Sequence, residues 1–275
     1  MSTAALAVLL VASMLAVGTT LSTTDFRALA DRPMVPVLAV LANVVVVPGL
    51  AVVLASLAGL GSDATFGIVL AAAAPGGGTG ALLTLHARGD LAVGAALQGV
   101  YAPLGLLSVP LWAWVAGYDP VPAGLGGVVL VAGGLLGQVV PVAVGMLLRR
   151  RRPEMAQRVH RVSRRVADVL LTVLVLYFLI TGVTRLPEVG WSAIGVIGVV
   201  VLACLSPALM PVFDPPAARR AVAMTTAVRN LSLALFVADA AGPVVVLTLL
   251  AYGLLMYGLS VPVALLLART AAPVS

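Results

Sequence analysis

The sequence predicts an all-helical integral membrane protein, and both its composition and the arrangement of its apolar residues lead to this class. Of its 275 residues, 61% are hydrophobic and 9% are charged, and the mean hydropathy is +1.16. A soluble domain carries about a quarter charged residues. The apolar residues come in long runs rather than in alternation, which is typical of membrane-spanning helices and not of half-buried strands. We therefore expect a helical bundle embedded in a lipid bilayer.

A transmembrane helix needs about 20 apolar residues, and by this measure the chain divides into nine spans. The first block has neither the basic leading segment nor the cleavage site of a signal peptide, so we interpret it as a span. The predicted spans are 3–22, 34–60, 65–87, 91–117, 124–148, 168–184, 191–213, 221–238 and 243–268.

The basic residues are all arginine, and their distribution predicts the topology. If successive loops alternate between the two sides of the membrane, fourteen of the sixteen arginines fall on one side, Arg185 alone falls on the other, and Arg229 lies inside a span. The positive-inside rule then places the N-terminus outside and the C-terminus in the cytoplasm, in an inner or plasma membrane. The net charge of +6 is thus explained by topology, and we expect no nucleic-acid partner.

Eight arginines lie in the segment "RRRRPEMAQRVHRVSRR", residues 149–165. We interpret 149–167 as a basic cytoplasmic connector between two halves of the bundle; recruitment of anionic lipid head groups is the alternative. His160 within it is expected to be a solvated loop residue. The single cysteine, Cys204, allows neither a disulfide framework nor a thiolate metal site, and we expect it to be a small packing residue.

The third span is interrupted at its centre by Pro75 and by three glycines, Gly76, Gly77 and Gly78, followed by Thr79. Such residues free backbone N–H and C=O groups, which at membrane depth are tolerated only where protein or a water-filled cavity satisfies them. The interruption therefore predicts a cavity or a helix crossing. The alternative is that the glycines only let helices pack closely.

The eighth span, "AVAMTTAVRNLSLALFVADA", carries a second interruption made of polar side chains. These are Thr225, Thr226, Arg229, Asn230 and Ser232. The third and eighth spans are five apart and run in opposite directions. Paired interruptions in inverted halves are the best sequence indication of a secondary transporter's substrate site, and the half-helix N-termini there suit an anion.

Three segments resemble the bile acid:sodium symporter family. "PGGGTGALLTLHARGD" is similar to that family's broken-helix motif, "GTTLSTTDFRALADRP" to its early Gly-x-x-Leu-x-x-x-Asp-Phe-Arg signature, and "VRNLSLAL" to its second crossover. They occur in family order and spacing, and from the first to the last they span about 210 of the 275 residues. The resemblance implies inverted five-helix repeats, here without the usual first helix, and a core domain that moves against a panel domain.

On this interpretation the first repeat and the helix opening the second occupy 1–148, and the rest of the second repeat occupies 168–275. Spans 2–4 and 7–9 form the core, and spans 1, 5 and 6 form the panel. Two discontinuous helices cross in the core.

The chain departs from the family pattern where sodium-coupled members bind their ion. A small polar pair after PGG is replaced by Gly80 and Ala81, and hydroxyl residues of the fourth helix are replaced by Gly94 and Gln98.

The second crossover departs as well. Thr225 replaces a glutamate and Arg229 a glutamine, while Asn230 matches. A hard cation needs several oxygen ligands, usually with a carboxylate, and no acidic residue lies at a span centre. The sodium sites therefore look dismantled, and we expect no metal and no cofactor.

Arg229 is the most informative residue, because a cation inside a span costs roughly 2.5–3.5 kcal/mol on insertion scales. Asp239 would lie about 15 Å away along an unbroken helix, too far for a direct pair. Three roles stay open: a fixed cation in place of sodium, a ligand for a substrate carboxylate, and a structural role. Asn43, Gln98, Tyr101 and Gln138 either line the cavity or join helices by hydrogen bonds.

The sequence thus predicts a secondary transporter that moves a small organic anion, bile-acid-like or another carboxylate, by alternating access and without sodium. The alternatives are an anion sensor or binding subunit without flux, and an efflux carrier of the related arsenite or auxin type. No catalytic set indicates an enzyme, and we expect a monomer or homodimer. The predicted substrate-binding residues are Pro75, Gly76, Gly77, Gly78, Thr79, Gln98, Thr225, Thr226, Arg229 and Asn230.

Overall fold

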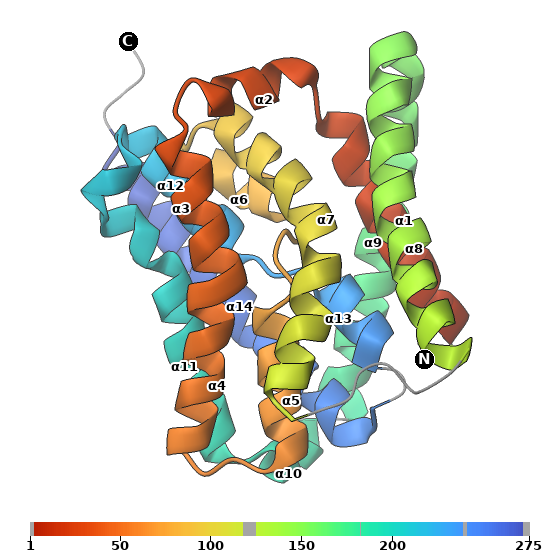
Figure 1. Ribbon diagram of the computed structural model, residues 1–275, viewed down its shortest axis with the longest axis vertical. Helices are drawn as coiled ribbons and strands as arrows, with labels where there is room; N and C mark the ends of the chain where they lie inside the picture. Colours follow the sequence, from red (N-terminus) through yellow and green to blue (C-terminus); the bar gives the residue numbers. More distant parts are fainter. Residues whose placement is uncertain (1–2, 118–124, 182, 239–240, 272–275) are drawn as a thin grey trace.

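The computed structural model describes residues 3–117, 125–181, 183–238 and 241–271, and every regular element within these ranges is helical (Figure 1). The first half contains α1 (Thr3–Thr20), α2 (Thr23–Ala30), α3 (Met34–Leu41), the π-helix η1 (Ala42–Val46), α4 (Val47–Leu57), α5 (Ser62–Ala72), α6 (Gly80–His86), α7 (Leu91–Val115) and α8 (Leu125–Arg151). The second half contains α9 (Pro153–Thr181), η2 (Val183–Arg185), α10 (Leu186–Val189), α11 (Trp191–Leu205), η3 (Ser206–Leu209), η4 (Pro211–Phe213), α12 (Pro216–Ala227), α13 (Leu231–Ala238) and α14 (Pro243–Arg269). The two ends of the chain lie at opposite ends of the bundle (Figure 1).

Five helical stretches in the described part of the chain are long and apolar enough to cross a membrane. They are Met34–Leu57, Leu91–Val115, Trp191–Leu209, Pro216–Ala238 and Pro243–Arg269. Ala4–Thr20 and Ser62–Ala72 are shorter apolar helices. The all-helical membrane class is therefore confirmed, while the count of nine spans stays a prediction.

Side-chain caps fix the turns at the end of the bundle where α2 lies across the helix ends (Figure 1). Ser22 and Asp25 form a capping box: the Ser22 side chain accepts from the Asp25 N–H, and the Asp25 carboxylate accepts from the Ser22 N–H at 2.8 Å. Asp90 caps α7 by accepting from the backbone N–H groups of Ala92 and Val93. Both caps satisfy N–H groups that a helix start leaves without partners, so these boundaries are encoded locally.

The basic segment 149–167 is helical rather than a loop. Helix α8 continues to Arg151 and α9 begins at Pro153, so only Arg152 separates the two helices. Proline is well suited to a first helical position, because the N–H group that it lacks would have no partner there. Most of the arginine side chains on this segment are exposed. They can therefore lie on a helix, because that part of the helix extends beyond the apolar part of the bundle.

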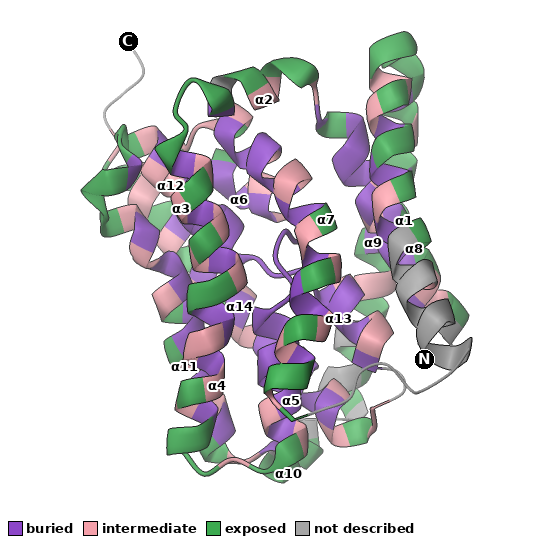
Figure 2. Ribbon diagram, viewed as in Figure 1, coloured by how far each residue is buried: buried purple, intermediate pink, exposed green. Residues whose placement is uncertain are grey.

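The helices pack in two groups. Helix α1 packs against α8 and α9, whereas α5 packs against α14 and α4, and α12 packs against α6, α7 and α11. Helix α1 also contacts α7 and α13, which joins the groups. Figure 2 shows the buried residues concentrated in the middle of the bundle, where two non-helical segments of the chain lie. This centre is where the two predicted interruptions lie.

Candidate functional site

The first interruption separates α5 from α6 over Ala73–Thr79. Pro75 has no N–H, and Gly76 has φ +83°, a conformation that favours glycine. Gly77 is required by a close approach: a Cβ there would lie 2.3 Å from the carbonyl oxygen of Arg229. The proline and the first two glycines thus have separate geometric reasons to be present.

The second interruption separates α12 from α13 and contains neither proline nor glycine. Helix α12 ends at Ala227, and Val228 takes an extended conformation with φ −86° and ψ 107°. Asn230 then starts α13, because its Oδ1 accepts from the Leu233 N–H and the Ser232 hydroxyl, both at 3.1 Å. A side-chain cap at this position is the usual way to begin a helix.

The two interruptions lie directly against each other. The Gly77 N–H donates to the Val228 carbonyl at 3.1 Å, and the Asn230 N–H donates to the Ala74 carbonyl at 2.8 Å. Each break therefore supplies partners for backbone groups that the other leaves free, as is needed away from water. We call this pair of segments, residues 73–79 and 228–230, the crossover.

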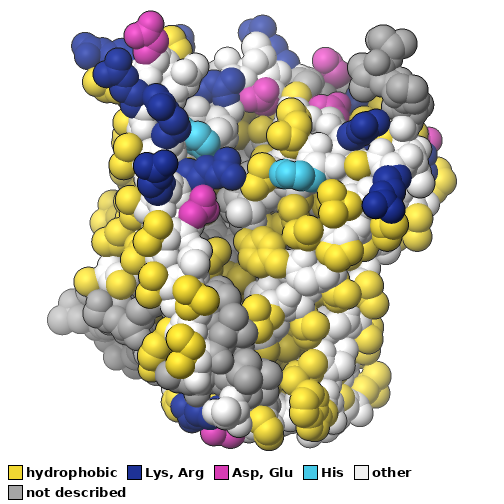
Figure 3. Space-filling view, turned by 180° about the vertical axis from the view of Figure 1, so that it is seen from behind, with side chains coloured by type: hydrophobic (Ala, Val, Ile, Leu, Met, Phe, Trp, Pro, Cys, Tyr) yellow, Lys and Arg dark blue, Asp and Glu magenta, His cyan; other side chains and the backbone are white. Residues whose placement is uncertain are grey.

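A cavity of about 410 Å³ adjoins the crossover on the side of α1 and α9. Of the predicted binding residues, Gly77, Gly78, Thr79, Gln98, Arg229 and Asn230 line it. Pro75, Gly76, Thr225 and Thr226 do not belong to its lining. Charged side chains from α2, α8 and α9 also line it, namely Asp25, Arg149, Arg164 and Asp168, and Figure 3 shows arginines gathered at one end of the molecule.

Two polar residues of the cavity, Ser13 and Tyr257, were missed by the sequence reasoning, and Ser232 was named only as part of the second interruption. Ser13 and Ser232 place their hydroxyl oxygens 3.1 Å apart, and Tyr257 places its hydroxyl 2.7 Å from that of Thr79. His160, expected to be a solvated loop residue, lines the cavity, and its Nδ1 lies 3.2 Å from the Thr19 hydroxyl. A polar residue inside an apolar span, as Ser13 is, was the available signal.

The Arg229 guanidinium is held within the core by protein groups, and its side chain is 1% exposed. Its Nη1 donates to the Asn43 Oδ1 at 3.0 Å and to the Ala72 carbonyl at 3.1 Å, and its Nη2 donates to the Cys204 Sγ at 3.1 Å. None of these three partners belongs to the cavity lining. Arg229 thus reaches the cavity wall while its charged end is held by groups behind the crossover.

Asn43 joins the guanidinium to the neighbouring helices. It lies in the π-helix η1, an irregularity frequent at functional sites, and its Nδ2 lies 2.9 Å from both the Tyr101 hydroxyl and the Thr226 hydroxyl. Thr226 therefore supports Arg229 through Asn43 rather than lining the cavity. The sequence left open whether Asn43 lines the cavity or joins helices by hydrogen bonds. Its described contacts join helices.

Cys204 has a contact that the sequence analysis did not predict. It is a buried residue of the hydrophobic core, as expected of a small packing residue, and it also accepts a hydrogen bond from the Arg229 guanidinium. The sequence offered no signal for this contact, because Cys204 lies in a uniformly apolar run that gives no indication of which helix face points inward.

The positions where the chain departs from the sodium-coupled pattern are close together. A Cβ on Gly80 would lie 2.7 Å from Gln98 Nε2, which donates to the Gly77 carbonyl, and a Cβ on Gly94 would lie 3.1 Å from Thr84 Oγ1. Thr225 donates its hydroxyl to the Ala221 carbonyl at 2.8 Å. Within the described ranges, no cluster of three or more His, Cys, Asp and Glu residues has a metal-binding arrangement.

Sequence comparison with known proteins identifies a family. The family model described as the Sodium Bile acid symporter family matches residues 7–186. Human sodium/bile acid cotransporter 4 is 28% identical over 236 residues, which cover 80% of this chain and 52% of the human protein. The mouse and rat proteins of the same name show the same identity and coverage. The chain thus spans about half the length of the curated relatives it matches.

Proposed function

The chain belongs to the sodium bile acid symporter family, and from this we propose that it is a secondary transporter that moves a small organic anion by alternating access. The observation that carries the proposal is the crossover itself, in which two interrupted helices exchange backbone hydrogen bonds beside a cavity of about 410 Å³. That volume falls within the usual range for small-molecule sites.

The proposed architecture has nine membrane spans, inverted repeats and two domains. Helices α1, α8 and α9 would form the panel, and the other helices the core, because the cavity lies between these groups. Transport would move one group against the other about the crossover, as in transporters built from inverted repeats.

The anion would bind where the cavity meets the crossover. Thr79, Asn230 and Gln98 line this region with polar groups, and the hydroxyl groups of Ser13, Ser232 and Tyr257 face the same space. The helix starts at α6 and α13 add partial positive charge, and Arg229 adds a full charge from behind. Pro75, Gly76, Thr225 and Thr226 would act on the anion by holding the crossover in place.

We further propose that transport does not depend on sodium. Two carbonyl oxygens near the crossover already accept hydrogen bonds, the Gly77 carbonyl from Gln98 and the Ala72 carbonyl from Arg229. A sodium ion would also approach the positive charge of Arg229, and the carboxylates that line the cavity, Asp25 and Asp168, lie on α2 and α9 and not in the crossover. Arg229 would thus serve as a built-in cation.

Flux into proteoliposomes tests both proposals. The substrate would be chosen by a thermal-shift screen of bile acids, keto acids and pantoate-like acids, because a ligand that binds the folded state raises its apparent stability.

We expect equal initial uptake rates with sodium or choline outside. A large loss of rate in choline would refute sodium independence, and binding without any flux would favour the sensor. Arg229→Gln should weaken anion binding without conferring sodium dependence.

The proposed orientation places the N-terminus outside a cell membrane and the C-terminus in the cytoplasm. The arginines gather at one end of the molecule (Figure 3), whereas Arg185 forms a bidentate pair with Glu188 at 2.8 and 2.9 Å, and this pair lowers the pKa of the Glu188 carboxyl. The positive-inside rule compares the number of basic residues on the two sides, so a single arginine at the other end does not oppose the assignment.

Thiol labelling of intact cells checks the orientation, because the native Cys204 is buried. Gln157→Cys on α9 should be protected from an impermeant reagent, and Ser62→Cys at the start of α5 should react. Both positions are exposed in the protein, so each is the control for the other. The reverse pattern would overturn the topology.

A further inference from the structure

Helix α9 carries a row of side chains that changes from basic to apolar along one side of the helix. Arg158, Arg161 and Arg165 follow one another at spacings of three and four residues, and Val169 and Val173 continue the row at spacings of four. These spacings bring neighbouring side chains together on a helix, and all five are exposed. We call this row, residues 158–173, the α9 stripe.

The arginines of the α9 stripe repel one another, because like charges at these spacings destabilise a helix. Within the described chain, no ion pair includes Arg161 or Arg165. The carboxylate nearest to them in the sequence, Asp168, lies 3.5 Å from Arg164 and is paired with it. An anion from outside the protein would therefore relieve the repulsion between Arg161 and Arg165.

A hollow of about 540 Å³ lies along the same side of α9 and offers room for such an anion. Among the described residues only side chains of α9 line it, including Arg161, Arg165, Val169 and Val173. Leu176 extends the apolar part of this side of the helix, about 16 Å beyond Arg165 along the axis. That length is about half of the roughly 30 Å hydrocarbon core of a bilayer, or one leaflet.

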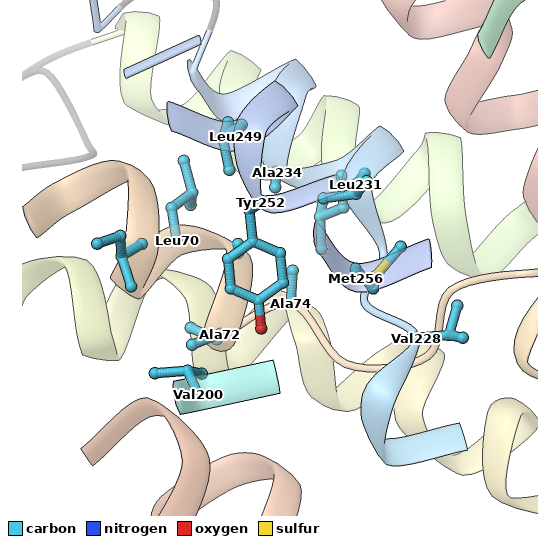
Figure 4. Packing of buried hydrophobic residues seen from close by; sticks show 14 of the residues in the cluster. Leu70, Ala72, Ala74, Val200, Val228, Leu231, Ala234, Leu249, Tyr252 and Met256 are labelled. Atoms are coloured by element: carbon cyan, nitrogen blue, oxygen red, sulfur yellow. The ribbon is translucent and has the colours of Figure 1, made fainter. Parts of the chain in front are cut away.

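The apolar side chains of the α9 stripe are not covered by the core of the protein. Figure 4 shows Leu249 and Met256 beside Tyr252 in the buried cluster, where apolar side chains pack on one another. Val169 and Val173 are instead 55% and 54% exposed. Figure 3 shows hydrophobic side chains next to the arginines on the surface of the molecule. This arrangement of basic and apolar groups complements a lipid with an anionic head group.

We propose that the α9 stripe binds an anionic phospholipid of the leaflet next to the arginine-rich end. Its phosphate lies between Arg161 and Arg165, and one acyl chain lies along Val169, Val173 and Leu176. Two parallel N–H groups of a guanidinium match two phosphate oxygens. A head group with a net negative charge is preferred to a zwitterionic one, because a choline cation would add to the positive charge already present.

The lipid site is distinct from the substrate site, and it does not depend on the proposed transport function. His160, Arg164 and Asp168 line both the hollow and the cavity beside the crossover. Arg161 and Arg165 line the hollow alone. Substitution of these two arginines therefore tests the lipid site without removing a residue of the cavity.

The first experiment titrates the purified chain, in neutral detergent, with phosphatidylglycerol and follows the midpoint of thermal unfolding, which rises when a ligand binds the folded state. We expect a saturable rise with phosphatidylglycerol and a clearly smaller one with phosphatidylcholine. Glycerol 1-phosphate, which has the anionic group without acyl chains, should not reproduce the rise. Equal rises with the two lipids overturn recognition by the arginines, and an equal rise with glycerol 1-phosphate overturns the lipid as the ligand.

A double variant, Arg161→Gln with Arg165→Gln, should raise the half-saturating amount of phosphatidylglycerol about 30-fold, from the contribution of two arginines at an anionic membrane surface. Arg150→Gln with Arg151→Gln is the matched control, because it removes two exposed arginines of the neighbouring helix α8 that do not line the hollow. The control should bind phosphatidylglycerol as the wild type does. Equal losses in the two double variants would assign the binding to the net charge of this end, and the site would be overturned.

The position of the lipid is tested on the wild-type protein, so the result does not depend on the folding of any variant. Phosphatidylglycerol with a photoreactive group in its acyl chain should label α9 between Val169 and Leu176. Labelling confined to other helices overturns the site, and this is also the result expected if a second copy of the chain covers this side of α9.

Discussion

The two interruptions that meet at the crossover are built by different means. The first, residues 73–79, is specified by its own backbone: Pro75 removes an N–H, Gly76 adopts a positive φ, and Gly77 admits the Arg229 carbonyl at a distance that no Cβ allows. The second, residues 228–230, consists of three residues with ordinary backbone freedom. It is held by the Asn230 cap and by hydrogen bonds to the first segment.

This difference shows that one break is largely local and that the other depends on tertiary contacts. A proline and glycines oppose an α-helix wherever they occur inside it. Valine, arginine and asparagine are all compatible with a helix, so residues 228–230 leave the helix because the partners across the crossover make another conformation better. The first segment should therefore be sensitive to backbone sterics, and the second to loss of side-chain contacts.

The largest effect is expected from Gly77→Ala. The added Cβ would overlap the Arg229 carbonyl oxygen at 2.3 Å, and it would separate the two segments that exchange hydrogen bonds. We expect destabilisation of about 3 kcal/mol, at the upper end for an overpacked site, measured as a lower midpoint of thermal unfolding in detergent.

Gly78→Ala is the matched control for this variant. The nearest atom to its Cβ would be 3.5 Å away, an ordinary contact, and its φ is not in the left-handed region. We expect an unfolding midpoint close to that of the wild type. An equal fall of the unfolding midpoint in the two variants would show that a side chain at either position destabilises the segment. The close approach of the Arg229 carbonyl would then not explain why residue 77 is a glycine.

A smaller effect is expected from Asn230→Ala. The variant keeps the backbone hydrogen bond to Ala74 but loses the side-chain bond to the Leu233 N–H. Replacing such a cap by alanine costs about 0.5–2 kcal/mol, which thermal unfolding of the purified protein would detect. An unchanged midpoint would mean that contacts across the crossover alone define the start of α13.

Ser232→Ala tests the contacts around the Asn230 cap without removing the cap itself. Of these variants it should lower the stability least. It removes one bond to Asn230 and the contact with Ser13 but leaves the Leu233 bond in place, and Ser13 keeps its bond to the Leu10 carbonyl. A loss of about 0.5 kcal/mol is expected for a hydrogen bond of this kind. A loss larger than that of Asn230→Ala would assign the second break to the Ser13–Ser232 contact instead of the cap.

The sequence by itself determined the features that depend on solvent and on local backbone chemistry. The long apolar runs require a bilayer, Pro75 with its glycines requires a break, and the arginines predict which end faces the cytoplasm. The polar side chains between Thr225 and Asn230 were enough to locate the second break and to pair it with the first. Each of these properties is written in a short stretch of chain, so no knowledge of neighbouring helices is needed.

Only the tertiary structure decided which residues share an environment. In a membrane helix, the face toward lipid and the face toward the protein are both apolar, so no hydrophobic pattern shows how the helix is rotated. For this reason the sequence could not reveal that Cys204 on α11 and Asn43 in η1 both contact Arg229, or that His160 on α9 lines the cavity. It also could not show that the guanidinium lies behind the crossover, because that position depends on the packing of four separate segments around one charge.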